Sequence, residues 1–193
     1  MSVYSAEGIP FFDIELKNRS TGVALLAADT DGIVVAFEPV AGAYETPALA
    51  VSTLDWGRNL TVGVVDANAS ITNVRVTVVG RDIHNRAVQE TITDALTGTR
   101  TIVGHVMFAS ITSLTTHVDG TVTGAADTLQ VGWGDEIQLP FDIALTTDIT
   151  HRRMDATSGV GTLDAAKQSW ILSGGNVPNA VRKYLVSGRS TVE

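Results

Sequence analysis

The segment from Asn73 to Thr93 contains two runs of alternating residues separated by a polar turn. In the first run Val74, Val76 and Val78 point to one side, because successive side chains of a β-strand point to opposite faces. Glycine, aspartate and asparagine lie between the two runs, and these residues favour turns. The segment therefore predicts a β-hairpin, and the rest of the chain has to supply strands that cover its apolar face.

The remaining sequence has the same character. Short runs rich in valine and threonine recur with turn signals every 8–12 residues, a spacing typical of all-β sandwiches and barrels. We therefore predict an antiparallel β-sandwich or barrel, jelly-roll-like, with at most one short helix. The helix candidate is Thr162 to Ile171, where Leu163, Ala166 and Trp170 share one face. Further strands are expected at 23–28, 33–37, 49–54, 60–65, 101–106, 109–117, 121–123, 128–131, 137–139 and 143–150.

Two polar segments between these runs are predicted to be turns. The first, Asp29 to Gly32, ends in an Asp-Gly pair, which is a strong hairpin signal. The second, 55–59, separates two strand candidates. We expect one domain, a sandwich over 21–172, with an extended arm at 1–20 that Phe11 and Phe12 anchor and a second arm at 173–193.

Composition narrows the possible functions. The formal net charge of -8 disfavours nucleic acid as a partner, since phosphate binding needs a basic surface. The chain has no cysteine, which excludes disulfides, thiol catalysis and cysteine-based zinc sites. No secretory signal pattern and no apolar run long enough for a membrane span is present, so we expect no membrane partner. Charged residues make up only 18%, and such a charge-poor surface favours assembly with neighbours.

Candidate metal sites are weak. Asp29, Asp31 and Glu38 match part of an EF-hand calcium loop, but the first ligand position would be Ala27, which cannot bind calcium. A plain hairpin turn is the preferred interpretation. The four histidines, His84, His105, His117 and His151, show no metal-binding spacing and are interpreted as surface or structural residues.

Catalytic and cofactor motifs are also incomplete. Gly159 and Gly161 match half of a dinucleotide fingerprint, but Asp164 stands where the third glycine should be. Asp135 and Glu136 are adjacent, so on a strand they would face opposite sides, and we interpret them as solvated turn charges. No Gly-x-Ser-x-Gly motif occurs. We therefore predict no catalytic, cofactor-binding or metal-binding residues, and a protein that is not an enzyme.

Two tryptophans leave two interpretations open. Trp56 and Trp133 lie in polar, glycine-containing segments that read as turns. They could form a platform on which a carbohydrate stacks or an anchor for a partner. The preferred interpretation is a lid over one end of the sandwich core.

Five sequence blocks between Arg58 and Pro140 share a pattern. The blocks are Arg58–Val62, Val74–Asp82, Val88–Thr93, Phe108–Ser113 and Thr128–Pro140, the last reading Thr-Leu-Gln-Val-Gly-Trp-Gly-Asp-Glu-Ile-Gln-Leu-Pro. Their order resembles small β-rich virion structural proteins of tailed bacteriophages, of the capsid decoration or cement type. The chain departs from that pattern at His84-Asn85-Arg86, which replaces a small glycine-containing loop.

The resemblance implies a function without catalysis. It implies a decoration protein, a homotrimer on the capsid surface of the virion that is assembled in the bacterial host cytoplasm and binds the major capsid protein. The arms at 1–20 and 176–193 would bridge capsomers, with the hairpin around His84 as a second contact. The alternatives are a tail tube or head-fibre subunit and a carbohydrate-binding β-sandwich module.

Overall fold

The computed structural model describes residues 3–4, 10–19, 21–22, 24–140, 149–153, 161–164, 166–172, 177–182 and 184–189. Every regular element in these ranges is a β-strand and none is a helix, which confirms the predicted antiparallel all-β, sandwich-like fold. The chain forms two compact units. A sandwich unit comprises 28–134, and a terminal unit combines 1–27 with 135–193.

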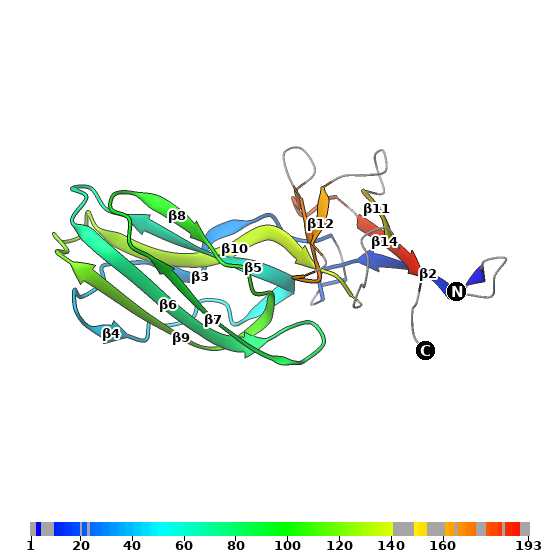
Figure 1. Ribbon diagram of the computed structural model, residues 1–193, viewed down its shortest axis with the longest axis horizontal. Helices are drawn as coiled ribbons and strands as arrows, with labels where there is room; N and C mark the ends of the chain where they lie inside the picture. The colour runs from blue at the N-terminus through cyan, green and yellow to red at the C-terminus, as the bar shows by residue number, and fades with distance from the viewer. Residues whose placement is uncertain are drawn as a thin grey trace. The chain divides into compact units, whose positions relative to one another are not determined.

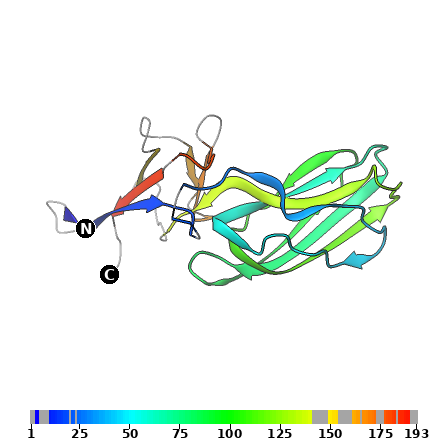
Figure 2. The same ribbon diagram turned by 180° about the vertical axis from the view of Figure 1, so that it is seen from behind.

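The sandwich unit consists of two facing layers. The layer of β6, β7 and β9 and the layer of β3, β5, β8 and β10 are seen from one side in Figure 1 and from behind in Figure 2. Neighbouring strands follow the order β10-β5-β9-β6-β7, with β3 beside β10, β4 beside β9 and β8 beside β5. The strands are β3 (Asp29–Phe37), β4 (Tyr44–Glu45), β5 (Thr53–Val65), β6 (Ile71–Arg81), β7 (Ala87–Asp94), β8 (Arg100–Val103), β9 (Phe108–Gly120) and β10 (Thr128–Gln138, whose residues 128–134 belong to this unit).

The hairpin predicted from the sequence is confirmed as β6 and β7. Their residues pair without interruption from Val74 opposite Asp94 to Arg81 opposite Ala87. The turn that joins them contains Asn85 at a φ of 63°, a left-handed conformation that asparagine tolerates well among residues with a side chain. The turn thus closes without the glycine that the resemblance led us to expect.

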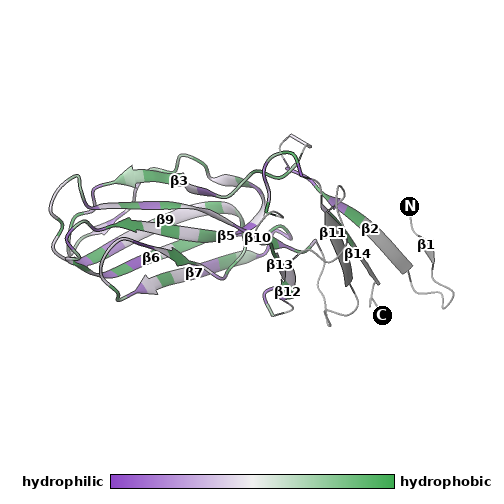
Figure 3. Ribbon diagram, turned by 90° about the horizontal axis from the view of Figure 1, so that it is seen from above, coloured by the Kyte–Doolittle hydropathy of each residue, from purple (hydrophilic) through white to green (hydrophobic). Residues whose placement is uncertain are grey.

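The core lies between the two layers. Val74, Val76 and Val78 are at most 1% exposed, as their alternation predicted, and Figure 3 shows the same alternation of hydropathy along β6. The facing layer contributes inward side chains that include Leu60 and Val131. Asp94 pairs with Val74 and lies on this side of the hairpin at its end. Glu90 pairs with Val78 and likewise faces inward. Its carboxylate accepts hydrogen bonds from the backbone N–H groups of residues 105 and 106 at 2.7 and 3.2 Å.

Both predicted turns of the first half are wrong. Residues 29–32 belong to β3 and residues 55–59 to β5, whereas 24–28, predicted as a strand, is not one. Strand β3 pairs with β10, where Asp29 lies opposite Trp133 and the register shifts twice. Gly32 lies against the Trp133 ring, since a Cβ at Gly32 would come within 2.3 Å of it. The glycine therefore permits a close contact between strands rather than a turn.

The terminal unit joins both ends of the chain. Its four-stranded sheet has the order β1-β2-β14-β11, so the segments predicted as separate arms contribute two neighbouring strands, β2 and β14. In the same unit Trp170 packs edge-on against Tyr184, with ring centroids 5.5 Å apart. The strands are β1 (Val3–Tyr4), β2 (Pro10–Leu16), β11 (Ile149–Arg153), β12 (Thr162–Asp164), β13 (Ser169–Ile171) and β14 (Tyr184–Arg189).

The helix expected at 162–171 is wrong, because this segment is the hairpin of β12 and β13. Leu163 pairs with Trp170, and Trp170 pairs in turn with Ile137 of β10. This arrangement buries Trp170 completely. A ten-residue helix gains little from its own propensity, so the burial of one large side chain between strands outweighs it. The strand predicted at 143–150 lies outside the described residues except for 149 and 150, which begin β11.

Candidate binding site on the outer sheet face

Four strands of the sandwich unit present a row of polar and aromatic residues on their outer face. Tyr44 of β4 pairs with His117 of β9, His117 with Arg75 of β6, and Arg75 with Thr93 of β7. The row faces outward because Arg75 lies between two buried valines, and side chains alternate along a strand. Alternation thus brings residues from four separate parts of the sequence together.

The row is held together by direct contacts. The rings of Tyr44 and His117 have centroids 4.4 Å apart at an interplanar angle of 40°. The Arg75 guanidinium donates a hydrogen bond to the Tyr44 hydroxyl at 3.1 Å. Although Tyr44 is 66% exposed, it is therefore positioned by two side chains, His117 of β9 and Arg75 of β6.

Beside this row lies a concave site of about 490 Å³. The Asn73 amide donates to the Asp119 carboxylate at 3.3 Å, and His117 Nδ1 lies 3.8 Å from the same carboxylate. Asn73, Arg75 and His117 can donate hydrogen bonds, whereas Thr93 and the carboxylates accept them. We call this the outer-face site, and its polar lining residues are Asn73, Arg75, Thr93, Asp94, His117 and Asp119.

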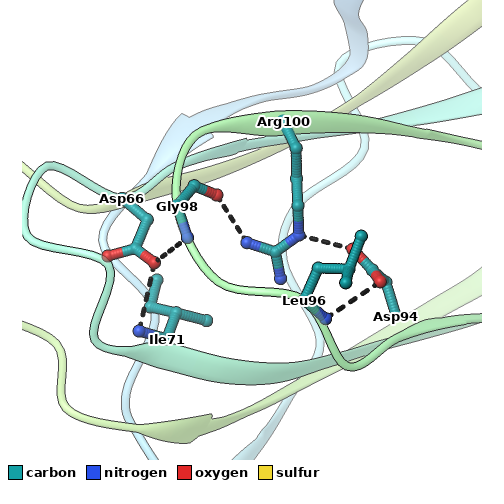
Figure 4. Close-up of polar contacts among 6 residues, drawn as sticks. All are labelled: Asp66, Ile71, Asp94, Leu96, Gly98 and Arg100. Atoms are coloured by element: carbon teal, nitrogen blue, oxygen red, sulfur yellow. Dashed lines mark hydrogen bonds and ion pairs between the residues drawn. The ribbon is translucent and has the colours of Figure 1, made fainter.

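The rim of the outer-face site is fixed by the loop that follows β7. The Asp94 carboxylate accepts from the Leu96 backbone N–H at 3.0 Å and from the Arg100 guanidinium, which also donates to the Gly98 carbonyl at 2.6 Å (Figure 4). Partial burial acts to raise the pKa of Asp94, but the hydrogen bonds from Leu96 and Arg100 outweigh it and lower the pKa below its ordinary value. Asp94 is therefore a carboxylate near neutral pH.

Two more aspartates, Asp66 and Asp127, hold the neighbouring loops in place by hydrogen bonds. Asp66 is 3% exposed, and its carboxylate accepts three hydrogen bonds from backbone N–H groups. The donors are Ser70 at 2.9 Å, Ile71 at 3.2 Å and Gly98 at 2.8 Å. Figure 4 shows the contacts with Ile71 and Gly98. Asp127 accepts from the backbone of Ala67 and from the hydroxyl and backbone of residue 123. The hydrogen bonds from residue 123 lower the pKa of Asp127. Loops 66–70, 95–99 and 121–127 thus form one cluster, the three-loop cluster.

The residues of the partial calcium motif lie in a strand rather than a turn. The Asp31 backbone N–H donates to the Asp29 carboxylate at 3.2 Å. A hydrogen bond between the two side chains and partial burial raise the pKa of Asp31. Glu38 is exposed just after the strand. In the described part of the chain, no group of three or more His, Asp or Glu side chains could hold a metal ion.

The histidines have different surroundings. His84 and His105 are exposed, whereas His117 lines the outer-face site. The side chain of His151, like that of Phe11 and Phe12, lies outside the described residues. Neither Arg75 as a site residue nor its proximity to His117 was predicted from the sequence. Both residues occupy outward-facing positions of strands with alternating side chains, and this pattern can be read from the sequence. The pairing that brings β6 beside β9 is long-range, so the pattern does not reveal that the two residues are neighbours.

Trp56 and Trp133 are in strands β5 and β10, so their assignment to turns is wrong. Trp133 belongs to the hydrophobic core and is 7% exposed, which leaves no open ring face for stacking. Trp56 is partly buried. In β5, Asp55 and Arg58 form a buried pair with N–O distances of 2.8 and 3.1 Å.

The assignment of Asp135 and Glu136 to a turn is wrong, because both lie in β10, and the interpretation as solvated charges is wrong for Glu136. This residue lies in β10, is 7% exposed and accepts a hydrogen bond from the Ser169 hydroxyl. The ammonium of Lys167 lies 3.5 Å from the same carboxylate and 3.6 Å from that of Asp164. These contacts connect β10 to the β12–β13 hairpin. Gly159 of the partial dinucleotide motif lies outside the described residues.

In the part of the chain that the structure describes, no helix is long and apolar enough to cross a membrane. Comparison with protein-family models, with curated proteins and with solved structures finds no match for this chain.

Proposed function

We propose that this chain is a structural, non-catalytic protein of a bacteriophage virion, a decoration protein that binds the major capsid protein as a homotrimer. One observation supports the proposal. The five sequence blocks that carry the resemblance correspond to β5, β6, β7, β9 and β10, five strands that follow one another as neighbours in the order β10-β5-β9-β6-β7. The blocks are therefore adjacent in space although they are scattered over 83 residues, 58–140, of the sequence.

The proposed mechanism is adhesion through the terminal unit. Strands β1 and β11 end the described order of the four-stranded sheet, so their outer edges are the places where a strand of a capsid protein can add. The exposed residues 84–86 of the turn between β6 and β7 supply the second contact. Many such contacts on a symmetric shell act together through multivalency.

Co-sedimentation with expanded phage capsid shells that lack the protein tests this proposal. A truncated chain that starts at Thr21 does not test β1 alone, because it also removes β2, which pairs with β14 from Leu16 to Phe11. A chain starting at Pro10 loses β1 and keeps β2. We expect saturable binding by the full chain and at least tenfold weaker binding by the chain that starts at Pro10.

A matched control is Leu96→Ser, which removes an apolar side chain that is 67% exposed on the sandwich unit. It should bind shells like the full chain. Sedimentation of the protein alone gives the second readout, where a trimer is expected. Rings or tubes without shell binding would contradict the proposal and favour a tail tube subunit. Equal binding by the full chain and by the chain that starts at Pro10 would show that β1 does not contribute to capsid binding.

A further inference from the structure

The outer-face site has features of a ligand site that the proposed capsid contacts do not use. Arg75 and His117 extend from the middle of paired strands, so their backbones are held by ladder hydrogen bonds on both sides. Side chains on strands are positioned more accurately than side chains on loops. The one loop at the rim is held by Asp94 and Arg100. The site is therefore built before any ligand arrives.

The charges at the site select among ligand classes. Asp94 and Asp119 supply two carboxylates and Arg75 supplies one guanidinium to the lining of the site, and a second guanidinium, that of Arg100, is bound to Asp94. These charges balance, so the site offers an anionic ligand no net attraction, which disfavours phosphate, sulfate and nucleic acid. A strongly apolar ligand would leave these polar groups without partners. The remaining class is neutral and rich in hydroxyl groups.

Neutral sugars meet both requirements. A sugar hydroxyl donates and accepts at once, so adjacent hydroxyls can pair with the donors Arg75 and Asn73 and with the Asp119 acceptor. The exposed ring of Tyr44 beside the site offers an apolar surface for the C–H face of a sugar, with its polar tip already bound to Arg75. The volume of about 490 Å³ lies within the range of small-ligand sites.

We propose that the outer-face site binds a neutral saccharide, with Arg75, His117 and Asp119 as its hydrogen-bonding residues and Tyr44 as its stacking residue. This site differs from the tryptophan platform considered from the sequence, because Trp133 is buried in the core. It lies on the sandwich unit and does not depend on the capsid proposal.

The test is a titration of ¹⁵N-labelled full-length protein with neutral hexasaccharides of glucose (α- and β-linked), mannose, galactose and N-acetylglucosamine, followed by amide NMR shifts. A heparin hexasaccharide serves as the anionic probe. We expect at least one neutral sugar to shift the amides of Arg75, His117 and Asp119 in a saturable way. Arg75→Ala and His117→Ala should each weaken that binding at least tenfold.

Arg81→Ala is the matched control, since it removes an exposed arginine from the same strand outside the site. It should leave binding unchanged. Thermal unfolding of each variant separates a lost ligand contact from a lost fold, and His117→Gln keeps a planar hydrogen-bonding group if His117→Ala does not fold. Binding by none of the neutral sugars, binding by heparin alone, or shifts centred on Trp56 would each overturn the proposal.

Discussion

Two groups of aspartates in the sandwich unit place the same side chain in opposite electrostatic situations. Asp66 and Asp127 in the three-loop cluster, and Asp94 directly before its loop 95–99, each accept hydrogen bonds from backbone N–H groups. At the start of β3, Asp29 and Asp31 lie beside each other. The pKa is lowered for Asp94 and Asp127 and raised for Asp31.

The difference shows what a carboxylate needs in order to stabilise a fold. The charges of Asp94 and Asp127 are solvated by hydrogen-bond donors of the protein, so ionisation of these two groups favours the folded state. In the β3 pair the partner of the Asp31 carboxyl is another carboxyl, so ionisation of Asp31 disfavours the folded state. The Asp-x-Asp motif at residues 29–31 does not reveal the raised pKa of Asp31, because the direction of a pKa shift depends on which hydrogen-bond donors surround the carboxyl in the folded protein.

The largest effect is expected for Asp66→Ala in the cluster. The variant leaves three backbone N–H groups, one buried and two part-buried, without their acceptor and should lower the free energy of unfolding by about 3 kcal/mol. Urea unfolding monitored by tryptophan fluorescence measures it. Asn68→Ala in the same loop removes two exposed side-chain hydrogen bonds and should cost less than about 0.5 kcal/mol. Equal losses in the two variants would show that the cluster does not depend on the Asp66 carboxylate.

The contact beside the β3 pair is tested by Gly32→Ala. The added Cβ would come within 2.3 Å of the Trp133 ring and 2.9 Å of the Asp29 carboxylate. Overpacking of this kind costs about 2 kcal/mol and displaces the ring, which a shift in Trp133 fluorescence would report. Thr30→Ala, an exposed change on the same strand, is the control. Unchanged stability and emission in Gly32→Ala would refute the close packing of β3 on Trp133.

The pH dependence of the cluster is tested with Asp127→Asn. A lowered pKa means that the carboxylate stabilises the fold above its ordinary value of 3.8 and that this contribution is lost as the pH falls through the lowered value. The variant should be less stable than the unmodified protein at pH 7, and the gap should shrink towards pH 2. Unfolding by urea across this range measures it. A gap that is independent of pH would contradict the assignment.

The smallest effect, of opposite sign, is expected for Asp31→Asn. A raised pKa means that the contribution of this group is present below 3.8 and is lost as the pH rises through the raised value. Removing the charge should therefore make the protein slightly more stable at pH 7, with no gain at low pH. Paired melting curves at pH 3 and pH 7 provide the test. A loss of stability at pH 7 would show that the pair is favourable when ionised.

Local alternation predicted the central hairpin correctly, down to the inward position of Val76. It succeeded because both strands are joined by a short turn, so their pairing is local. The same reasoning failed at Asp29–Gly32 and at Trp56, where turn-forming residues lie in long strands. In both places the partner strand is distant in the sequence, and its contacts decide the conformation against local preference.

The candidate site shows the same limit. Outward positions of β6 and β9 could be read from the sequence, but His117 is 42 residues from Arg75 and pairs with it through long-range ladder hydrogen bonds. The helix expected around Trp170 failed for a related reason. A ring that a helix would place on one face is instead buried between β12, β10 and Tyr184.

The sequence by itself determined the all-β class, the central hairpin and its buried face, because these follow from side-chain alternation and turn chemistry within one short segment. Only the tertiary structure decided which strands are neighbours, that β2 and β14 pair across the whole chain, and which polar side chains meet at the outer-face site. The physical reason is that strand pairing satisfies backbone groups equally well for many partners, so the choice depends on the burial of side chains that are remote in sequence.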